Sequence, residues 1–444
     1  MIRYAKAVSV LLLIAVLCCG GAAAAGTVEG LNVTYQLGGV SMSSEVQAVG
    51  PVTGGGFILG MANSSGAVLM KTDAAGKEMW RTVLPGDDVR TLVVLNNGGS
   101  LVATFSLSVE GTEEEGYTFG GSSWLIRTDD TGNILWQEEL VGIGVGDIGV
   151  SGNKIIFAGW FWDTDKGFTQ TYLLENGAPG NDQIQLGNES ASRIPLTLYL
   201  ETDGTLVLAG GTTSDYSWSS VSDVAWIAKV KNGVIQRETI LRSGSVEYLG
   251  DNYGQGGCTY AICKAQDGGY IVVGSTPPYL LTFSAGIAWA SHVNKDLGIQ
   301  WTKELDYCFA PFGVVEFGDG YLIAGMDGHD DPVWLTLSVG GAITETEKIS
   351  QNGKNSRFND VASISAGSAA LVGWTMPEST AQGILITLSD SDTPADVPAA
   401  DGAGLWIAGA AVVILILAGA VYFVVIRKPE PAQKPSAKKG GKKN

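Results

Sequence analysis

The sequence KTDAAGKEMW, from Lys71 to Trp80, returns as RTDDTGNILW from Arg127 to Trp136 and, in a looser form, as VNKDLGIQW from Val293 to Trp301. In each copy an apolar segment ends at Asp or Asn, a Gly follows three or four residues later, and a second apolar segment leads to a Trp. This order is typical of a tight β-hairpin, because Asp, Asn and Gly adopt the backbone angles of the turn. A hairpin that recurs at long intervals predicts a repeat fold.

The hairpin belongs to a larger unit of four short apolar segments, separated by turns rich in Gly, Asn and Asp. In the second unit we expect strands at 89–95, 100–106, 123–128 and 134–140. A Gly-bearing turn precedes the second strand of each unit, at Gly56, Gly99, Gly152, Gly204, Gly269, Gly320 and Gly367. Seven units of four strands predict an all-β protein, a seven-bladed β-propeller.

The seventh unit supplies only three strand-like segments before the chain reaches SDSDTPADVPAADGAG. A lone strand pattern near the other end, LNVTYQL from Leu31 to Leu37, resembles the fourth strands elsewhere, since VTYQLGG compares with MWRTVLPG and LWQEELVG. We therefore expect the propeller to be closed by this N-terminal strand. It would be the outermost strand of the last blade, which leaves no sheet edge open.

Both ends of the chain have the composition of targeting segments. Residues 1–25 form a predicted signal peptide, with two basic residues, an apolar run and small residues before the cleavage region. Cys18 would allow lipidation instead, but Leu17 precedes it where a small residue is preferred. Residues 405–426 are 22 residues without a charge. As a helix they would reach about 33 Å, enough for a bilayer core of about 30 Å.

The tail after this segment is strongly basic, which predicts that it is cytoplasmic and that the preceding chain is outside the cell. The predicted organisation is a signal peptide at 1–25, a propeller ectodomain at 26–389, a stalk at 390–404, a transmembrane helix at 405–426 and a tail at 427–444. The predicted location is the cell membrane, in a single-pass arrangement.

Charge excludes one class of partner. The chain has 27 basic and 45 acidic residues, and the predicted leader and tail hold nine of the basic residues but only one acid. The remainder, with 18 basic and 44 acidic residues, has a net charge of −26. Such a surface repels nucleic acid and anionic lipid, so we expect no nucleic-acid partner. It is suited to cation binding, or simply to solubility in a salty exterior.

The loops differ between the two faces of the predicted propeller. Loops between first and second strands, and between third and fourth strands, are short and share what we call the compact face. The opposite, elaborated face carries longer loops, expected at 107–122, 163–168, 212–223, 242–257, 276–284 and 327–331. Long polar loops on a rigid scaffold commonly carry binding sites.

Aromatic residues divide into a core set and a candidate binding set. Trp124, Trp226, Trp289 and Trp334, with Tyr172, recur near the start of the third strand and are expected in the core between blades. The ligand-binding residues that we expect on the elaborated face are Glu113, Trp160, Trp162, Tyr216, Trp218 and Tyr253.

Motifs for catalysis are lacking in the sequence. We find no zinc-type spacing, Gly-rich phosphate loop or nucleophile elbow, and assign no catalytic residue. His292 lies inside a third strand, where a structural role is expected. His329 lies among Asp327, Asp330 and Asp331, which form either a solvated turn or a candidate metal site for Ca²⁺. No other cofactor is predicted.

Covalent features are expected at three Cys and three Asn residues. Of Cys258, Cys263 and Cys308, the first and last precede or begin first strands near the elaborated face, so the expected disulfide is Cys258–Cys308. Asn32, Asn63 and Asn188 lie in sequons and are glycosylation candidates.

The hairpin residues Asp73, Gly76 and Trp80 resemble the repeat of PQQ-like (quinoprotein-like) β-propellers, and DGGYIVVG from Asp267 to Gly274 is similar to repeats of archaeal and bacterial surface proteins. The resemblance covers most of 31–389 and is sharp in three units. It implies a propeller scaffold, catalytic in some members and not in others. The adjacent Cys pair of the alcohol-oxidising members occurs here only as Cys18 and Cys19, inside the leader, so that activity is not implied.

The sequence thus predicts a membrane-anchored cell-surface propeller that acts as a binding or scaffold module for an extracellular protein, glycan or envelope partner. The alternative is an extracellular polysaccharide-active enzyme, a glycoside hydrolase or lyase, that uses carboxylates at the channel mouth. We favour the non-catalytic role. An acid pair with a neighbouring Arg at the axis would favour the enzyme.

Overall fold

The computed structural model describes residues 24–28, 31–37, 44–112, 116–188, 191–211, 224–242, 246–248, 251–253, 257–276, 287–306, 308, 310–349, 356–375 and 382–390. The chain divides into two units, Met1–Asp396 and Val397–Asn444, and the second lies outside the described residues. The predicted transmembrane segment, stalk and tail therefore also lie outside them. Among the described residues there is no helix long and apolar enough to cross a membrane.

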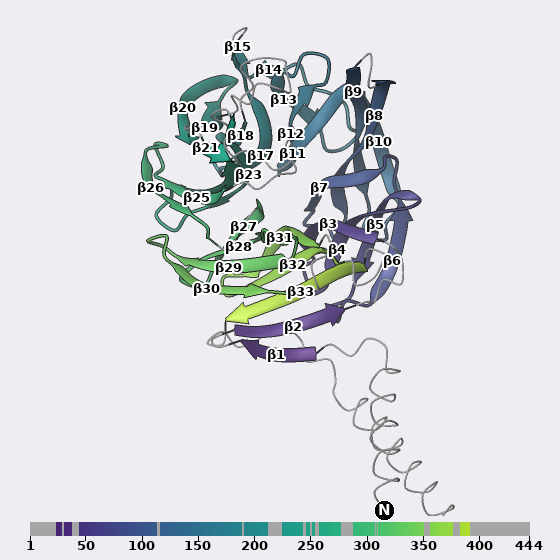
Figure 1. Cartoon of the computed structure of the whole chain (residues 1–444). Coiled ribbons are helices and arrows are strands. Elements are labelled where there is room, and N and C mark those ends of the chain that lie inside the picture. The colour runs from purple at the N-terminus through teal and green to yellow at the C-terminus, as the bar shows by residue number, and fades with distance from the viewer. Residues whose placement is uncertain are drawn as a thin grey trace, which may run out of the picture. The chain divides into compact units, whose positions relative to one another are not determined.

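Seven sheets surround one axis, and we number them as blades in chain order (Figure 1). Blade 1 contains β3 (Ser44–Pro51), β4 (Phe57–Asn63), β5 (Gly66–Thr72) and β6 (Glu78–Val83). Blade 2 contains β7 (Asp88–Val94), β8 (Ser100–Thr112), β9 (Gly116–Thr128) and β10 (Ile134–Val141). Blade 3 contains β11 (Ile143–Ser151), β12 (Lys154–Phe161), β13 (Gly167–Leu173) and β14 (Ile184–Gln185). Blade 4 contains β17 (Ile194–Leu200), β18 (Leu206–Gly211), β19 (Ala225–Lys231) and β20 (Val234–Arg242).

The later blades follow the same antiparallel order. Blade 5 contains β23 (Cys258–Lys264), β24 (Tyr270–Thr276), β25 (Ile287–Val293) and β26 (Ile299–Glu304). Blade 6 contains β27 (Ala310–Phe317), β28 (Gly320–Met326), β29 (Pro332–Ser338) and β30 (Ile343–Lys348). Blade 7 contains β31 (Arg357–Ser365), β32 (Ser368–Thr375), β33 (Gln382–Asp390), β2 (Leu31–Leu37) and β1 (Ala24–Val28). Two small hairpins occur in the links that connect successive blades along the chain. The first pairs β15 (Gly187–Asn188) with β16 (Ala191–Ser192), and the second pairs β21 (Val246–Tyr248) with β22 (Asp251–Tyr253). The seven-bladed, all-β prediction is confirmed.

Burial explains why the second strands are continuous apolar runs. Every residue of β24 and β28 is buried, because each blade packs against a neighbour on both faces. The outer strand β6 instead alternates between half-buried and exposed residues. Trp226, Trp289 and Trp334 are among the largest fully buried side chains, as expected for residues between blades.

Every first strand contains a bulge at the same place. The register with the second strand shifts across one residue in each blade, which leaves that residue unpaired. The bulged residues are Gln47, Arg90, Gly146, Leu196, Tyr260, Phe312 and Asn359. Since the first strands surround the axis (Figure 1), these bulges form a ring of structurally equivalent positions.

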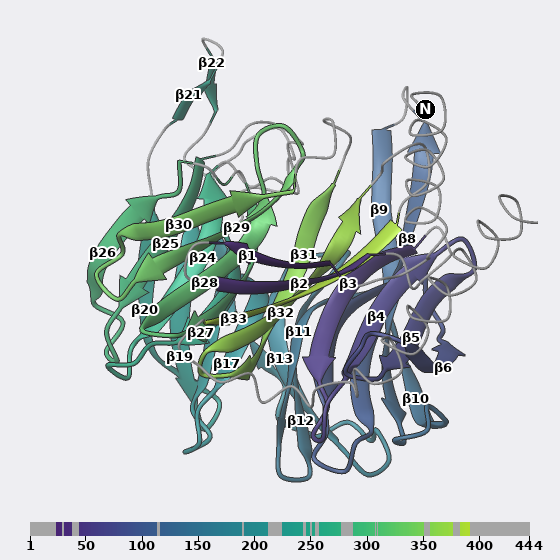
Figure 2. The same ribbon diagram turned by 90° about the horizontal axis from the view of Figure 1, so that it is seen from below.

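Blade 7 joins both ends of the described chain. β2 pairs antiparallel with β33, with Val33 opposite Leu388, and β1 pairs with β2 on the other side (Figures 1 and 2). We expected Leu31–Leu37 to be the outermost strand of this blade. That detail is wrong, because β1 lies beyond it. β1 begins at Ala24, so its first two residues belong to the predicted signal peptide.

The repeated hairpins contact one another from blade to blade. The Trp at the end of each quoted sequence lies on the hairpin Gly of the next blade, and its indole N–H donates to a carbonyl of that hairpin. Trp80 bonds to the carbonyl of Asp130 at 3.1 Å, Trp136 to that of Leu174 at 3.0 Å, and Trp301 to that of Val339 at 3.2 Å. The corresponding glycines are Gly132, Gly177 and Gly341, all with positive φ. The repeat thus fixes blade 1 to blade 2, blade 2 to blade 3 and blade 5 to blade 6.

Two local predictions are wrong. The segment 107–122 was expected to be a loop, but β8 continues to Thr112 and β9 begins at Gly116, so the two strands form one long hairpin. Gly and Ser residues concealed its strand pairing. Tyr172 was expected near the start of the third strand of blade 3, but it pairs with Ile155 near the end of β13, and Phe168 occupies the position opposite Gly159.

Candidate binding site at the axis

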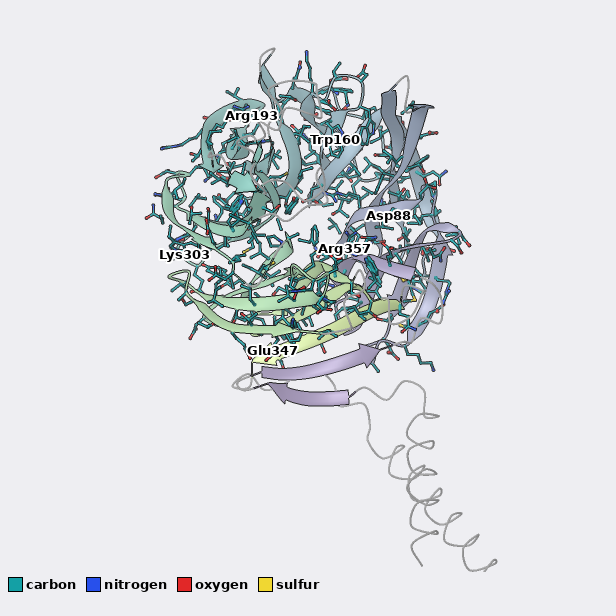
Figure 3. All side chains as sticks on the ribbon, viewed as in Figure 1. Asp88, Trp160, Arg193, Lys303, Glu347 and Arg357 are labelled. Atoms are coloured by element: carbon teal, nitrogen blue, oxygen red, sulfur yellow. The ribbon has the colours of Figure 1, made fainter. Side chains whose placement is uncertain are left out.

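The first strands bring charged side chains from three blades to the axis on the elaborated face. Glu45 lies in β3, Asp88 and Arg90 in β7, and Arg357 at the start of β31. Figure 3 shows Asp88 and Arg357 on inner strands, whereas Lys303 and Glu347 lie on outer strands. We call Glu45, Asp88, Arg90 and Arg357, together with the aromatic residues Tyr260, Phe312 and Trp374, the axial cluster.

Asp88 is a buried acid whose pKa depends on the three other charged residues of the axial cluster. Burial raises the pKa of Asp88 to about 6. The hydrogen bond that its Oδ1 accepts from the Val89 N–H, at 2.7 Å, acts in the opposite direction and lowers the pKa. The nearby Glu45 carboxylate raises it further, and the Arg90 and Arg357 guanidinium groups lower it. Asp88 is thus an acid that titrates close to neutral pH within reach of a second acid and two arginines.

Arg357 is held by three neighbours. Its Nε donates to Oδ1 of Asn359 at 2.6 Å, and its guanidinium carbon lies 5.4 Å from the ring centre of Phe312 and 5.8 Å from that of Trp374. Cation–π contacts of this kind orient a guanidinium group without using its terminal N–H donors. Among the described residues, the two terminal nitrogens have no hydrogen-bond or ion-pair partner. The contacts with Asn359, Phe312 and Trp374 therefore orient the guanidinium group and leave its terminal donors unused by the described residues.

The aromatic part of the cluster continues into blade 5. The Tyr260 and Phe312 rings lie 5.7 Å apart, and the Tyr260 hydroxyl shares a hydrogen bond of 2.9 Å with the Ser275 hydroxyl. Nε1 of Trp374 is buried and has no partner among the described residues. The cluster therefore combines ring faces with both donors and acceptors.

A further carboxylate, that of Asp147, connects adjacent blades. Asp147 follows the bulge of β11 and accepts hydrogen bonds from the backbone N–H groups of Ile148 and Leu198, at 2.8 and 2.9 Å, and from the Thr91 hydroxyl at 2.9 Å. Burial raises the pKa of Asp147. Its oxygens are occupied by these donors, which indicates a structural role.

Arg90 lies beside this carboxylate. Its Nε donates to the carbonyl of Gly146 at 3.4 Å. Burial lowers the pKa of its guanidinium group, although the nearby carboxylates of Asp147 and Asp88 raise it in part. Arg90 therefore balances the buried carboxylates of its own blade and the next, whereas the terminal donors of Arg357 are unpaired within the part of the chain that the structure describes.

Of the binding residues predicted from sequence, the structure describes the side chains of two. Trp160 and Trp162 pack edge to face, with ring centres 5.4 Å apart, at the end of β12 on the elaborated face. Trp160 covers Gly144, where a Cβ would come within 2.3 Å of its ring. Tyr253 ends β22, and Glu113, Tyr216 and Trp218 lie outside the described residues.

The predicted metal residues form an ordered turn. Oδ1 of Asp327 accepts the backbone N–H groups of His329 at 2.8 Å and Asp331 at 3.0 Å, and Lys348 Nζ lies 3.4 Å from Oδ2 of Asp327. Asp330 has a φ of 60° within this turn. In the part of the chain that the structure describes, no group of three His, Cys, Asp or Glu side chains is arranged to hold a metal ion. The calcium site remains a hypothesis.

His292, expected to be structural, lies 3.1 Å from the Asp267 carboxylate and packs on Trp301.

The two Cys of the predicted disulfide are both buried. The Cys258 Sγ lies 3.9 Å from the Thr259 carbonyl oxygen, and the Cys308 Sγ lies 3.6 Å from that of Met326. Their pairing stays a prediction.

Of the sequons, Asn63 ends β4, and its Oδ1 accepts the Ser65 N–H at 2.8 Å. Asn32 lies in β2 and Asn188 in β15.

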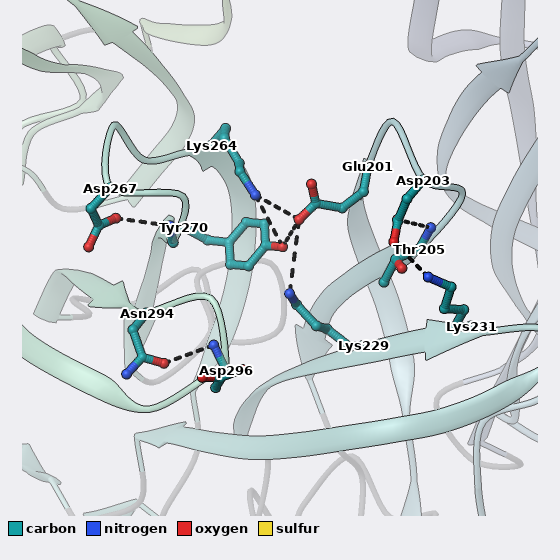
Figure 4. A network of polar contacts seen from close by, with 11 residues as sticks. Glu201, Asp203, Thr205, Lys229, Lys231, Lys264, Asp267, Tyr270, Asn294 and Asp296 are labelled. Atoms are coloured by element: carbon teal, nitrogen blue, oxygen red, sulfur yellow. Dashed lines mark hydrogen bonds and ion pairs between the residues drawn. The ribbon is translucent and has the colours of Figure 1, made fainter.

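A second polar cluster lies between blades 4 and 5 (Figure 4). Oε1 of Glu201 accepts hydrogen bonds from Lys264 Nζ at 2.6 Å and from the Tyr270 hydroxyl, and Lys229 Nζ lies 3.9 Å away. Burial, together with the bond to Glu201, raises the pKa of Tyr270. These groups pair with one another, so the cluster connects two blades and offers little to a ligand.

Sequence reasoning did not identify the axial cluster. Its members lie far apart in the chain, and none belongs to a motif. The available signal was the bulge position of each first strand, since Arg90, Tyr260 and Phe312 all occupy it and Arg357 lies two residues before Asn359.

No family model matches the sequence, and no curated protein matches it. Among solved structures, the WD40 β-propeller domain of Doa1 aligns with a TM-score of 0.50 and 11% identity, over 82% of this chain and 99% of that chain. The Dos1 propeller aligns at 0.46 with 10% identity, over 75% of each chain. Drosophila Plexin A, in its complex with Semaphorin 1b, aligns at 0.45 with 8% identity, over 80% and 86%. The likeness to the Doa1 domain shows a propeller fold and no activity.

Proposed function

We propose that this protein is a membrane-anchored cell-surface module that binds a glycan at the axial cluster. The observation that carries the proposal is Arg357, which Asn359, Phe312 and Trp374 orient near the carboxylates of Asp88 and Glu45 and whose terminal nitrogens have no partner among the described residues. A sugar hydroxyl both donates and accepts hydrogen bonds, so it uses carboxylates and a guanidinium group together. Aromatic rings supply the apolar surface that such sites need.

Supporting observations for the finer parts of this proposal come from other regions. The apolar segment 405–426 and the basic tail favour a membrane anchor. The contact of Trp80 with Gly132, repeated in two other blade pairs, favours a PQQ-like repeat. The pairing of β2 with β33 favours closure of the ring by the N-terminal strand.

The test is a glycan array probed with the full chain in mild detergent, with Arg357→Gln as the site variant. Arg237→Gln, on the exposed outer strand β20, is the matched control because it removes the same charge away from the axis. We expect the wild type and the control to bind the same glycans and Arg357→Gln to lose about tenfold or more in affinity. Equal binding by all three proteins, or no glycan binding at all, would contradict the proposal.

A polysaccharide-active enzyme is the second candidate, and one observation favours it. Asp88 and Glu45 form an acid pair near the Arg357 guanidinium group, and Asp88 has the raised pKa that suits a proton donor. Incubation of the array ligands with the wild type should then release shorter saccharides, and Asp88→Asn should bind without release. Intact ligands after incubation with the wild type would exclude this candidate.

A further inference from the structure

A cavity of about 670 Å³ lies between blades 5 and 6, on the elaborated face. Its walls come from the start of β25, the end of β26, the turn between β28 and β29, and β30. In Figure 1, β25 and β26 of blade 5 lie beside β29 and β30 of blade 6. The volume is within the range of small-molecule sites, roughly 300–1,000 Å³. None of its lining residues belongs to the axial cluster.

The floor and the rim of this cavity differ in chemistry. Ala288, Leu305, Cys308 and Val333 line it and belong to the hydrophobic core between the two blades. Glu304 and Asp306 line it as exposed carboxylates. An occupant therefore meets an apolar surface at one end and negative charge at the other.

Asp327 supplies a fixed carboxylate in the wall. Its side chain is only 10% exposed, and Oδ1 is held by the two backbone N–H groups of the turn. Oδ2 faces Lys348 Nζ at 3.4 Å and His329 Nδ1 at 3.8 Å. Both distances exceed the 2.7–2.9 Å or so of a good charge-assisted hydrogen bond. The side chains of Lys348 and His329 are 52% and 82% exposed, so solvent screens both contacts.

We propose that this cavity binds a primary ammonium group carried on a short aliphatic chain, such as an alkylamine or a lysine side chain. The ammonium group lies at Oδ2 of Asp327 and replaces Lys348, and the carbon chain covers Leu305 and Val333. The cation that Asp327 has, Lys348 Nζ at 3.4 Å, is half exposed to solvent, so a ligand whose ammonium group approaches Oδ2 more closely gives this buried carboxylate a better partner. The apolar floor favours an organic cation over a metal ion, for which the described residues form no ligand set.

Two variants distinguish the effect of the Asp327 charge from the role of Asp327 in holding its turn. Asp327→Asn keeps an Oδ1 acceptor for the backbone N–H groups of His329 and Asp331 and removes the negative charge. Lys348→Met keeps the apolar stem and removes the resident ammonium group. Lys295→Met, on the exposed hairpin between β25 and β26, is the matched control because it lies at the opposite end of these strands.

The experiment is isothermal titration calorimetry of the full chain in detergent with n-butylammonium, 1-butanol and Ca²⁺ as separate probes. We expect butylammonium to bind the wild type and the Lys295→Met control equally. It should bind Lys348→Met about tenfold more tightly and lose measurable binding to a folded Asp327→Asn variant. Equal binding of butylammonium to the wild type and Asp327→Asn, equal affinity for 1-butanol, or displacement of butylammonium by Ca²⁺ would overturn the proposal. Loss of glycan binding by Arg357→Gln bears on the axial cluster alone.

Discussion

Oδ2 of Asp360, in blade 7, accepts a hydrogen bond of 3.0 Å from the backbone N–H of Val49, in blade 1, across 311 residues of sequence. Asp147 makes the same contact from blade 3 to the Leu198 N–H in blade 4, at 2.9 Å. Each Asp directly follows the bulged residue of its first strand, and each donor N–H lies at the equivalent place in the next blade. The bulge therefore aims one carboxylate at the neighbouring blade.

Removal of this carboxylate should destabilise the ring. Asp360→Ala leaves the N–H groups of Val49 and Val361 without their acceptor, a loss of about 1–3 kcal/mol in the free energy of unfolding. Denaturant unfolding measures it. Asp319→Ala, in an exposed turn, is the control and should change stability by about 0.5 kcal/mol or less. Equal stability of the two variants would show that the contact contributes nothing.

The same residue should make stability depend on pH. Burial raises the pKa of Asp360 to about 7 from its ordinary value of 3.8, so the folded state binds this proton more tightly than the unfolded state. The contribution is complete below pH 4 and is lost as the pH rises through 7. The difference in Tm, Asp360→Asn minus wild type, should therefore increase between pH 5 and pH 8. A difference that falls over this range would contradict the raised pKa.

The contact between Trp80 and Gly132 should tolerate no side chain. A Cβ at Gly132 would come within 2.7 Å of the Trp80 ring, whereas a Cβ at Gly204 meets nothing within 4 Å. Both glycines have similar positive φ, 86° and 79°, so Gly204→Ala reports the backbone strain alone, about 1–2 kcal/mol. Gly132→Ala should lower the free energy of unfolding by clearly more than Gly204→Ala. Matching losses would mean that the indole ring moves aside freely.

The N-terminal strand should be needed for a stable seventh blade. Thr34 lies in β2 between Ala25 of β1 and Thr387 of β33, so Thr34→Pro removes a strand N–H from the sheet. We expect a lower Tm for Thr34→Pro than for Thr34→Val, which keeps the N–H. N-terminal sequencing of the mature protein shows whether cleavage near residue 25 shortens β1 while leaving β2 whole. An unchanged Tm in Thr34→Pro would mean that β2 does not close the ring.

The sequence by itself determined the repeat. The Asp, Gly and Trp of each hairpin, and the Gly-bearing turns, are local signals, because turn geometry depends on a few neighbouring residues. They predicted the number of blades, the strand order and the buried Trp226, Trp289 and Trp334. Local signals failed at Leu107 to Ser122, where pairing between β8 and β9 overrides a composition rich in Gly and Ser.

Only the tertiary structure decided which side chains meet. Asp88 and Arg357 lie in blades 2 and 7, and they approach each other because the first strands of the seven blades surround one axis. Asp327 and Leu305 line one cavity only because blades 5 and 6 pack side by side. Turn chemistry acts over a few residues, whereas these sites are assembled by packing between blades, which the order of residues along one strand does not encode.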